Sequence, residues 1–150
     1  MNATVQTGYF FMPEHIILVG ASERPHSLGE RIFSHLLGSS YQGKITPVNL
    51  RHSSVAGLPS YSSLSKIPGQ ADLVVAVIPH DHYDTLFKAC RKKGLRHIIL
   101  IQDWENLPPE SCKNARSIIQ KYHGDELNIS VCNSAGVQLP SLNLNIGTQA

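Results

Sequence analysis

Small residues and a second glycine follow the first strongly apolar run of the chain, Ile16–Gly20. Glycine lets a backbone approach a phosphate group closely, and the start of a helix offers free N–H groups and the positive end of its dipole. The segment after the run therefore favours a phosphate-binding turn. Its candidate residues are Gly20, Ala21, Ser22, Ser27, Leu28 and Gly29.

The same segment has a purely structural interpretation. Ser27 is a good helix N-cap, and Glu30 stands three residues later, as in a capping box. The two glycines then do no more than form a tight turn. The segment also lacks the G-x-G-x-x-G spacing of the dinucleotide-binding fingerprint.

A basic residue follows the second apolar run, where the chain continues Asn49-Leu50-Arg51-His52. NAD-binding domains place an acidic residue there to bind the ribose hydroxyls. An arginine instead suits a ribose phosphate, as in NADP or coenzyme A. The alternative is that Arg51 is an ordinary solvated surface residue.

The segments after the later runs offer weaker candidates. His80-Asp81-His82 invites a metal, but no further ligands stand at a recognisable spacing, so we expect no metal and interpret Asp81 as a helix cap. Gln102 is followed by Asp103 and Glu105, which are suited to acid–base chemistry or to a solvated loop. Cys132 and Ser134 suggest a nucleophile, but no paired histidine supports it, so we expect an inert cysteine.

Alternating apolar and amphipathic segments would position these residues. Apolar runs at 16–20, 44–49, 72–79, 97–101 and 128–132 alternate with helical patterns at 27–40, 81–94 and 108–124. This alternation predicts an α/β fold of three layers: a doubly wound, parallel, five-stranded, Rossmann-like sheet with helices on both faces. We expect the strand order 3-2-1-4-5, with the run at 72–79 as the third strand.

Composition limits the class of protein further. The chain has 150 residues, 41% of them hydrophobic, which suffices for one domain at 13–150 after an N-terminal extension at 1–12. The net charge of +2 without a long basic cluster argues against nucleic acid, and no apolar stretch is long enough for a membrane helix. Three cysteines without motif spacing predict reduced thiols in the cytoplasm.

Three stretches together resemble a known family. IILVGASERPHSLGERIFSHLL, YQGKITPVNLRHSSVAGLPSYSSLSKIPGQADLVVAVIP and NSAGV are similar to the CoA-binding domain of the NDP-forming acyl-CoA synthetases. The same domain occurs in the succinyl-CoA synthetase alpha subunit and in bacterial protein lysine acetyltransferases. The resemblance implies a site for coenzyme A or acyl-CoA. It would place Gly20, Ala21, Ser22, Ser27 and Gly29 at the diphosphate, Arg51 near the 3′-phosphate, and Ile78 and Pro79 along adenine or upper pantetheine, with Leu28, Asn49, Gln102 and Asn133 as further contacts.

The later loops depart from the family. Asp103-Trp104 stands where the family has a glycine–aromatic pair, and of a Gly-Pro-Asn motif only Asn133 survives. In the family these loops face the reactive end of CoA, and the catalytic histidine lies in a following domain. We therefore expect a CoA-binding domain that is not catalytic alone. It would belong to a bacterial, cytoplasmic synthetase-like or acetyltransferase-like protein, with further domains or a beta-type subunit as partners. The alternatives are an NAD(P)-binding regulatory domain and an interaction module with a decayed ligand site.

Overall fold

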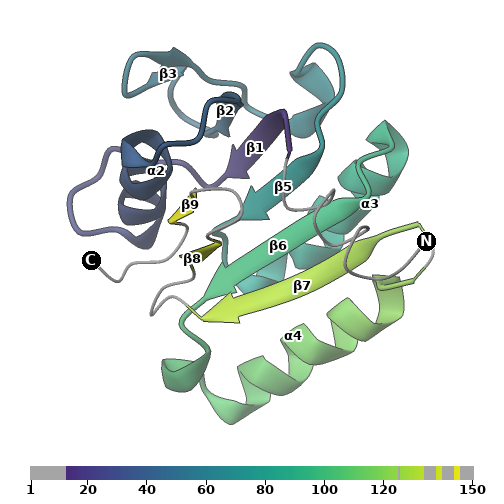
Figure 1. The fold of residues 1–150 in the computed structure, drawn as a ribbon. Helices are drawn as coiled ribbons and strands as arrows, with labels where there is room; N and C mark the ends of the chain where they lie inside the picture. The colour runs from purple at the N-terminus through teal and green to yellow at the C-terminus, as the bar shows by residue number, and fades with distance from the viewer. Residues whose placement is uncertain (1–12, 125, 134–137, 140–143, 146–150) are drawn as a thin grey trace.

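A parallel sheet lies between two layers of helices in the computed structural model, which describes residues 13–124, 126–133, 138–139 and 144–145 (Figure 1). The predicted α/β, Rossmann-like, five-stranded sheet is confirmed. Each strand begins within one residue of the start of an apolar run and ends within three residues of the end of that run. The strands are β1 (His15–Val19), β2 (Lys44–Val48), β5 (Leu73–Ala76), β6 (His97–Gln102) and β7 (Asn128–Asn133).

The strands lie in the order β2-β1-β5-β6-β7, and every neighbouring pair is parallel. Beyond β2, Tyr61 forms a single parallel bridge with Val48, and its N–H donates to the Pro47 carbonyl at 3.2 Å. With this bridge counted as the third strand, the six positions read 3-2-1-4-5-6, and the first five match the predicted order, although the run at 72–79 was expected as the third strand and is the fourth here. The bridge, rather than β5, occupies the outer position, and β5 lies beside β1.

Burial explains the place of β5. All of its residues are buried, which requires a strand on each edge and a helix on each face. The chain between β2 and β5 contains no α-helix among its described residues. It forms a short hairpin of β3 (Ser54–Val55) and β4 (Leu58–Pro59), followed by the 3-10 helix η1 (Leu64–Lys66).

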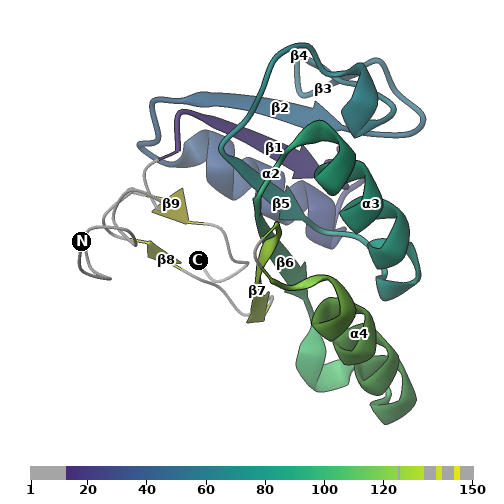
Figure 2. The same cartoon turned by 90° about the vertical axis from the view of Figure 1, so that its right-hand side faces the viewer.

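Successive side chains of each strand point to opposite faces of the sheet. Ile16 and Leu18 point to one face, where they pack against α2 (Leu28–Gly38). Ile17 and its neighbours on the other face pack against α3 (Tyr83–Lys93) and α4 (Pro109–Tyr122). Figure 2 shows α2 separated by the sheet from α3 and α4. The predicted three-layer arrangement is therefore present.

Several predicted helix ends are confirmed. Ser27 is the N-cap of α2, and its Oγ accepts the Glu30 N–H at 3.1 Å. Only half of the capping box forms, because the Glu30 carboxylate accepts from Ser34 Oγ instead. Gly94 ends α3 in the left-handed conformation at φ +82°, and Pro109 begins α4.

The predicted cap by Asp81 is wrong. His80, Asp81 and His82 form a separate 3-10 turn, η2, before α3 begins at Tyr83. The Asp81 carboxylate lies 3.2 Å from His80 Nε2 and does not cap the helix, whose N-cap is His82.

Two features complete the described chain. The strands β8 (Gln138–Leu139) and β9 (Leu144–Asn145) form a small antiparallel pair beside α2 that the sequence patterns did not indicate (Figure 1). The predicted N-terminal extension at 1–12 lies outside the described residues. None of the described helices combines the length and the apolar character that crossing a membrane requires.

Candidate functional site

A cavity of about 860 Å³ opens at the carboxyl ends of β1, β2 and β5. Its apolar wall includes Leu64 of η1 and Leu86 and Ala89 of α3. Its polar rim comes from the loops that follow β1 and β2. In doubly wound folds, ligands bind in this region, beyond the strand ends where the direction of winding reverses.

Most of the predicted site residues line this cavity. They are Gly20, Ala21, Ser22, Asn49, Arg51, Ile78 and Pro79. Ser27, Leu28 and Gly29 form the adjoining start of α2. Gln102 and Asn133 lie side by side at the ends of β6 and β7, outside the cavity lining, so their predicted contact with a ligand rests on the family resemblance alone.

The two glycines of the first turn are required by close packing. Gly20 has φ +94°, and a Cβ there would collide with the Val77 carbonyl oxygen at the end of β5. Gly29 is buried, and a Cβ there would collide with the carbonyl oxygen of Gly20. The pair lets α2 start directly against the turn. This packing brings the amino end of α2 to the rim of the cavity.

Asn49 connects the two loops of the rim. Its Nδ2 donates to the Ala21 carbonyl at 2.8 Å, across a separation of 28 residues. Its Oδ1 accepts the N–H groups of Arg51 at 2.7 Å and His52 at 3.0 Å. The position of Arg51 is therefore coupled to the turn after β1.

Glu23 holds the first loop from a second side. Its carboxylate accepts the Ala56 N–H at 2.8 Å. Ala56 and Gly57 form the turn between β3 and β4, both with positive φ. The hairpin thus supports the rim without entering the apolar part of the cavity.

Arg24 also lines the cavity, and sequence reasoning missed it, because a charged residue in a loop is usually just solvated. Arg24 and Arg51 are both exposed. Within the described part of the chain, neither guanidinium forms an ion pair. With Glu23 as the single carboxylate of the lining, the two arginines make the rim suited to an anion.

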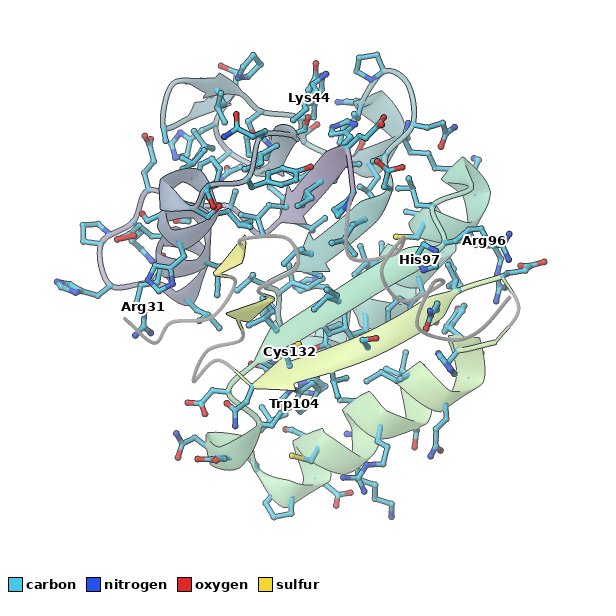
Figure 3. The ribbon with its side chains drawn as sticks, in the orientation of Figure 1. Arg31, Lys44, Arg96, His97, Trp104 and Cys132 are labelled. Carbon is cyan, nitrogen blue, oxygen red and sulfur yellow. The ribbon has the colours of Figure 1, made fainter. Side chains whose placement is uncertain are left out.

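The ends of β6 and β7 carry the residues that depart from the family. The Trp104 indole N–H donates to the Cys132 carbonyl at 3.1 Å and ties the turn η3 (Trp104–Asn106) to β7 (Figure 3). Asp103 accepts a hydrogen bond from the Asn106 amide at 2.8 Å. These contacts hold the loops together, and Glu105 is exposed. No cluster for acid–base chemistry is evident among them.

The cysteines and histidines offer no other centre in the described chain. All three cysteines are unpaired, as predicted, and burial raises the pKa of the Cys132 thiol, which favours its unreactive protonated form. Ser134 lies outside the described residues. Among those that are described, no group of three or more His, Cys, Asp and Glu residues is arranged to hold a metal ion.

Comparison with known proteins gives consistent matches. A family model described as "CoA binding domain" matches residues 14–138. The alpha subunit of the ADP-forming acetate–CoA ligase II of Pyrococcus furiosus is 32% identical over 139 residues, which cover 91% of this chain and 30% of that protein. The chain therefore spans less than a third of this relative.

Solved structures share the fold. A crystal structure from Pyrococcus horikoshii is 27% identical, with a TM-score of 0.72, and the match covers 93% of this chain and 32% of the other. A dinucleotide-forming acetyl-coenzyme A synthetase of Candidatus Korarchaeum cryptofilum is 24% identical, with a TM-score of 0.69 over 91% of this chain and 30% of that one. The second likeness concerns the fold alone.

Proposed function

Because this chain belongs to the CoA binding domain family, we propose that it binds coenzyme A or an acyl-CoA in the cavity at the ends of β1, β2 and β5. One observation carries the proposal. The glycine turn after β1 and the arginine after β2 border the same cavity, and Asn49 joins them through hydrogen bonds. A nucleotide with phosphate groups would suit this site, because backbone N–H groups, the amino end of a helix and a guanidinium group each bind anions.

Each part of the rim would bind one part of the ligand. The turn at Gly20–Ser22 and the amino end of α2 would take the diphosphate. Arg51 would take the 3′-phosphate through charge-assisted hydrogen bonds. Ile78 and Pro79 would lie along adenine or upper pantetheine. Asn49 is a positioning residue, since both polar atoms of its side chain form hydrogen bonds with backbone groups of the protein.

The wider context is also a proposal. We infer that the chain is the CoA-binding part of an acyl-CoA synthetase-like protein in the cytoplasm, inactive without further domains or a beta-type subunit. The P. furiosus relative is named as a ligase subunit, and it comes from an archaeon. It supports the synthetase context, and it supports neither the acetyltransferase context nor the bacterial origin that the sequence suggested.

An NADP-binding domain is the second candidate, because Arg51 at the cavity rim also suits a ribose 2′-phosphate. Calorimetry of the purified chain with CoA, dephospho-CoA, NAD and NADP separates the two. We expect CoA to bind most tightly. Binding of NADP without CoA would establish the second candidate. No binding of any ligand up to millimolar concentration would indicate a decayed site.

A further inference from the structure

Arg24 is held at the cavity by two serines that flank it in the loop. Its N–H donates to Ser22 Oγ at 2.9 Å, and its carbonyl accepts from Ser27 Oγ at 2.8 Å. The Ser27 N–H adds a second bond to the same carbonyl at 3.2 Å. The backbone of Arg24 is thus fixed on both sides, although its side chain is exposed.

One of these two serines, Ser27, is also the N-cap of α2. Ser27 Oγ accepts the Glu30 N–H while it donates to Arg24. Arg24 therefore stands at the amino end of α2, where the helix dipole favours negative charge. Arg51 approaches the cavity from the other loop, after β2, where this fold places the residue that contacts the ribose.

We propose that Arg24 is a second phosphate-binding residue of this site, and that the two arginines bind different phosphates of one ligand. Arg24 binds the diphosphate, and Arg51 binds the phosphate on the ribose. The proposal rests on the proposed function and extends it.

The division of roles has a thermodynamic signature. A residue that binds the diphosphate contributes equally to CoA and dephospho-CoA, since both contain it. A residue that binds the 3′-phosphate contributes only to CoA. Two arginines on separate phosphates act independently, so the effects of their removal on affinity multiply.

Calorimetry on the wild type, Arg24→Ala, Arg51→Ala and the double variant tests the proposal with CoA and dephospho-CoA. We expect Arg24→Ala to weaken both ligands by a similar factor, about tenfold or more. Arg51→Ala should weaken CoA alone, and the double variant should show the product of the two factors for CoA. Arg116→Ala, which removes an exposed charge on α4 outside the cavity lining, is the matched control and should change neither affinity.

The other outcomes are distinct. If the wild type binds CoA and Arg24→Ala binds both ligands as tightly as wild type, this inference is wrong and the proposed function stands. If Arg24→Ala weakens CoA alone, or the double variant loses no more affinity than a single variant, both arginines share one phosphate and the division of roles is wrong. If the wild type binds neither ligand, the proposed function and this inference both fail. Unchanged melting temperatures confirm that the variants are folded.

Discussion

The side chain of Asn49 donates a 2.8 Å hydrogen bond to the carbonyl of Ala21, and this bond joins the two loops that border the cavity. The same side chain accepts two backbone N–H groups of its own loop. A single half-buried amide therefore sets the distance between the proposed diphosphate site and Arg51. Replacement of Asn49 should therefore affect the binding of ligands that contact both loops.

Asn49→Ala should weaken CoA more than it weakens ADP, because CoA needs both loops in register while ADP lacks the 3′-phosphate. Loss of the bonds should also lower the free energy of unfolding by about 1–3 kcal/mol. Calorimetry and urea unfolding measure the two effects. Asn49→Asp keeps the acceptor oxygen but places a charged carboxylate oxygen against the Ala21 carbonyl, so it should also destabilise the protein and weaken CoA. Equal losses for CoA and ADP would mean that Asn49 does not set the spacing.

Gly29 provides a test of packing that is separate from binding. Gly29→Ala should destabilise the protein by about 1–3 kcal/mol, because the added Cβ would meet the Gly20 carbonyl oxygen and displace α2 from the turn. Thermal or urea unfolding measures this. Gly38→Ala in the same helix is the control, because a Cβ there meets nothing within 4 Å. It should leave stability unchanged or raise it by up to about 1 kcal/mol. Equal stability of the two variants would contradict the close packing of Gly29.

The carboxyl group of Asp84 should make the stability of the protein depend on pH. Asp84 belongs to α3, on the face of the sheet opposite α2. The hydrogen bond from the Tyr122 hydroxyl, at 2.6 Å, and that from Lys88 lower the pKa of Asp84 below its ordinary value of 3.8. The folded-state pKa is thus below the unfolded one. The stabilisation is complete above the unfolded pKa and is lost as the pH falls through the folded pKa.

Tyr122→Phe keeps the ring on Phe87 and removes the hydrogen bond. We expect the pKa of Asp84 to rise toward its ordinary value in this variant, as followed by the NMR shift of its carboxyl carbon. Lys88→Ala should raise it as well, because the ammonium group both donates a hydrogen bond to the carboxylate and attracts its charge. A pKa that stays unchanged in Tyr122→Phe would show that the hydroxyl does not hold the carboxylate.

Catalytic inactivity of the isolated chain is a further prediction. Asp103 and Trp104 are occupied in local hydrogen bonds, to Asn106 and to the Cys132 carbonyl. The purified chain, supplied with acetate, CoA, Mg²⁺ and ATP, should form no acetyl-CoA above the no-protein background. Replacing ATP with GTP should give the same result. Formation of the thioester with either nucleotide would contradict the prediction and would place a complete active site in this chain.

The sequence predicted the sheet well because its signal is burial. The continuous apolar residues of β5 and β6 indicate strands covered on both faces, and both lie inside the sheet. The sequence did not indicate the bridge at Tyr61 beyond β2, because a single residue among serines shows no hydrophobic periodicity. Asp81 was expected as a cap from its residue type, yet the chain forms a 3-10 turn first.

The candidate site was predictable in position and less so in detail. Residues at strand ends were identified because the topology of the fold places ligands there. Arg24 was not, because its proposed role depends on a contact with the cap Ser27 and on a cavity that only the folded chain contains. The assignment of Gly29 to a phosphate stays a prediction. The structure adds that a Cβ at Gly29 would collide with the Gly20 carbonyl oxygen, a contact between segments that spacing alone does not indicate.

Arg51 gives the most direct test of which nucleotide the cavity holds. Wild type should bind CoA about tenfold or more tightly than dephospho-CoA, since a charge-assisted hydrogen bond to the 3′-phosphate contributes about 1.5–3 kcal/mol. Because Arg51 is exposed, this preference should shrink as salt is raised from 50 mM to about 1 M, where the Debye length falls to about 3 Å.

The Arg51→Ala variant should show little preference at any salt concentration, and its affinity for dephospho-CoA should match that of wild type. Arg51→Lys keeps the charge and loses the planar fork, so it should retain part of the preference and all of its salt dependence. Calorimetric titrations at three salt concentrations measure these differences. A preference for CoA that persists unchanged in Arg51→Ala would assign the 3′-phosphate to another cation. Equal binding of CoA and dephospho-CoA by wild type would show that Arg51 is a solvated surface residue and that the cavity does not recognise the ribose phosphate.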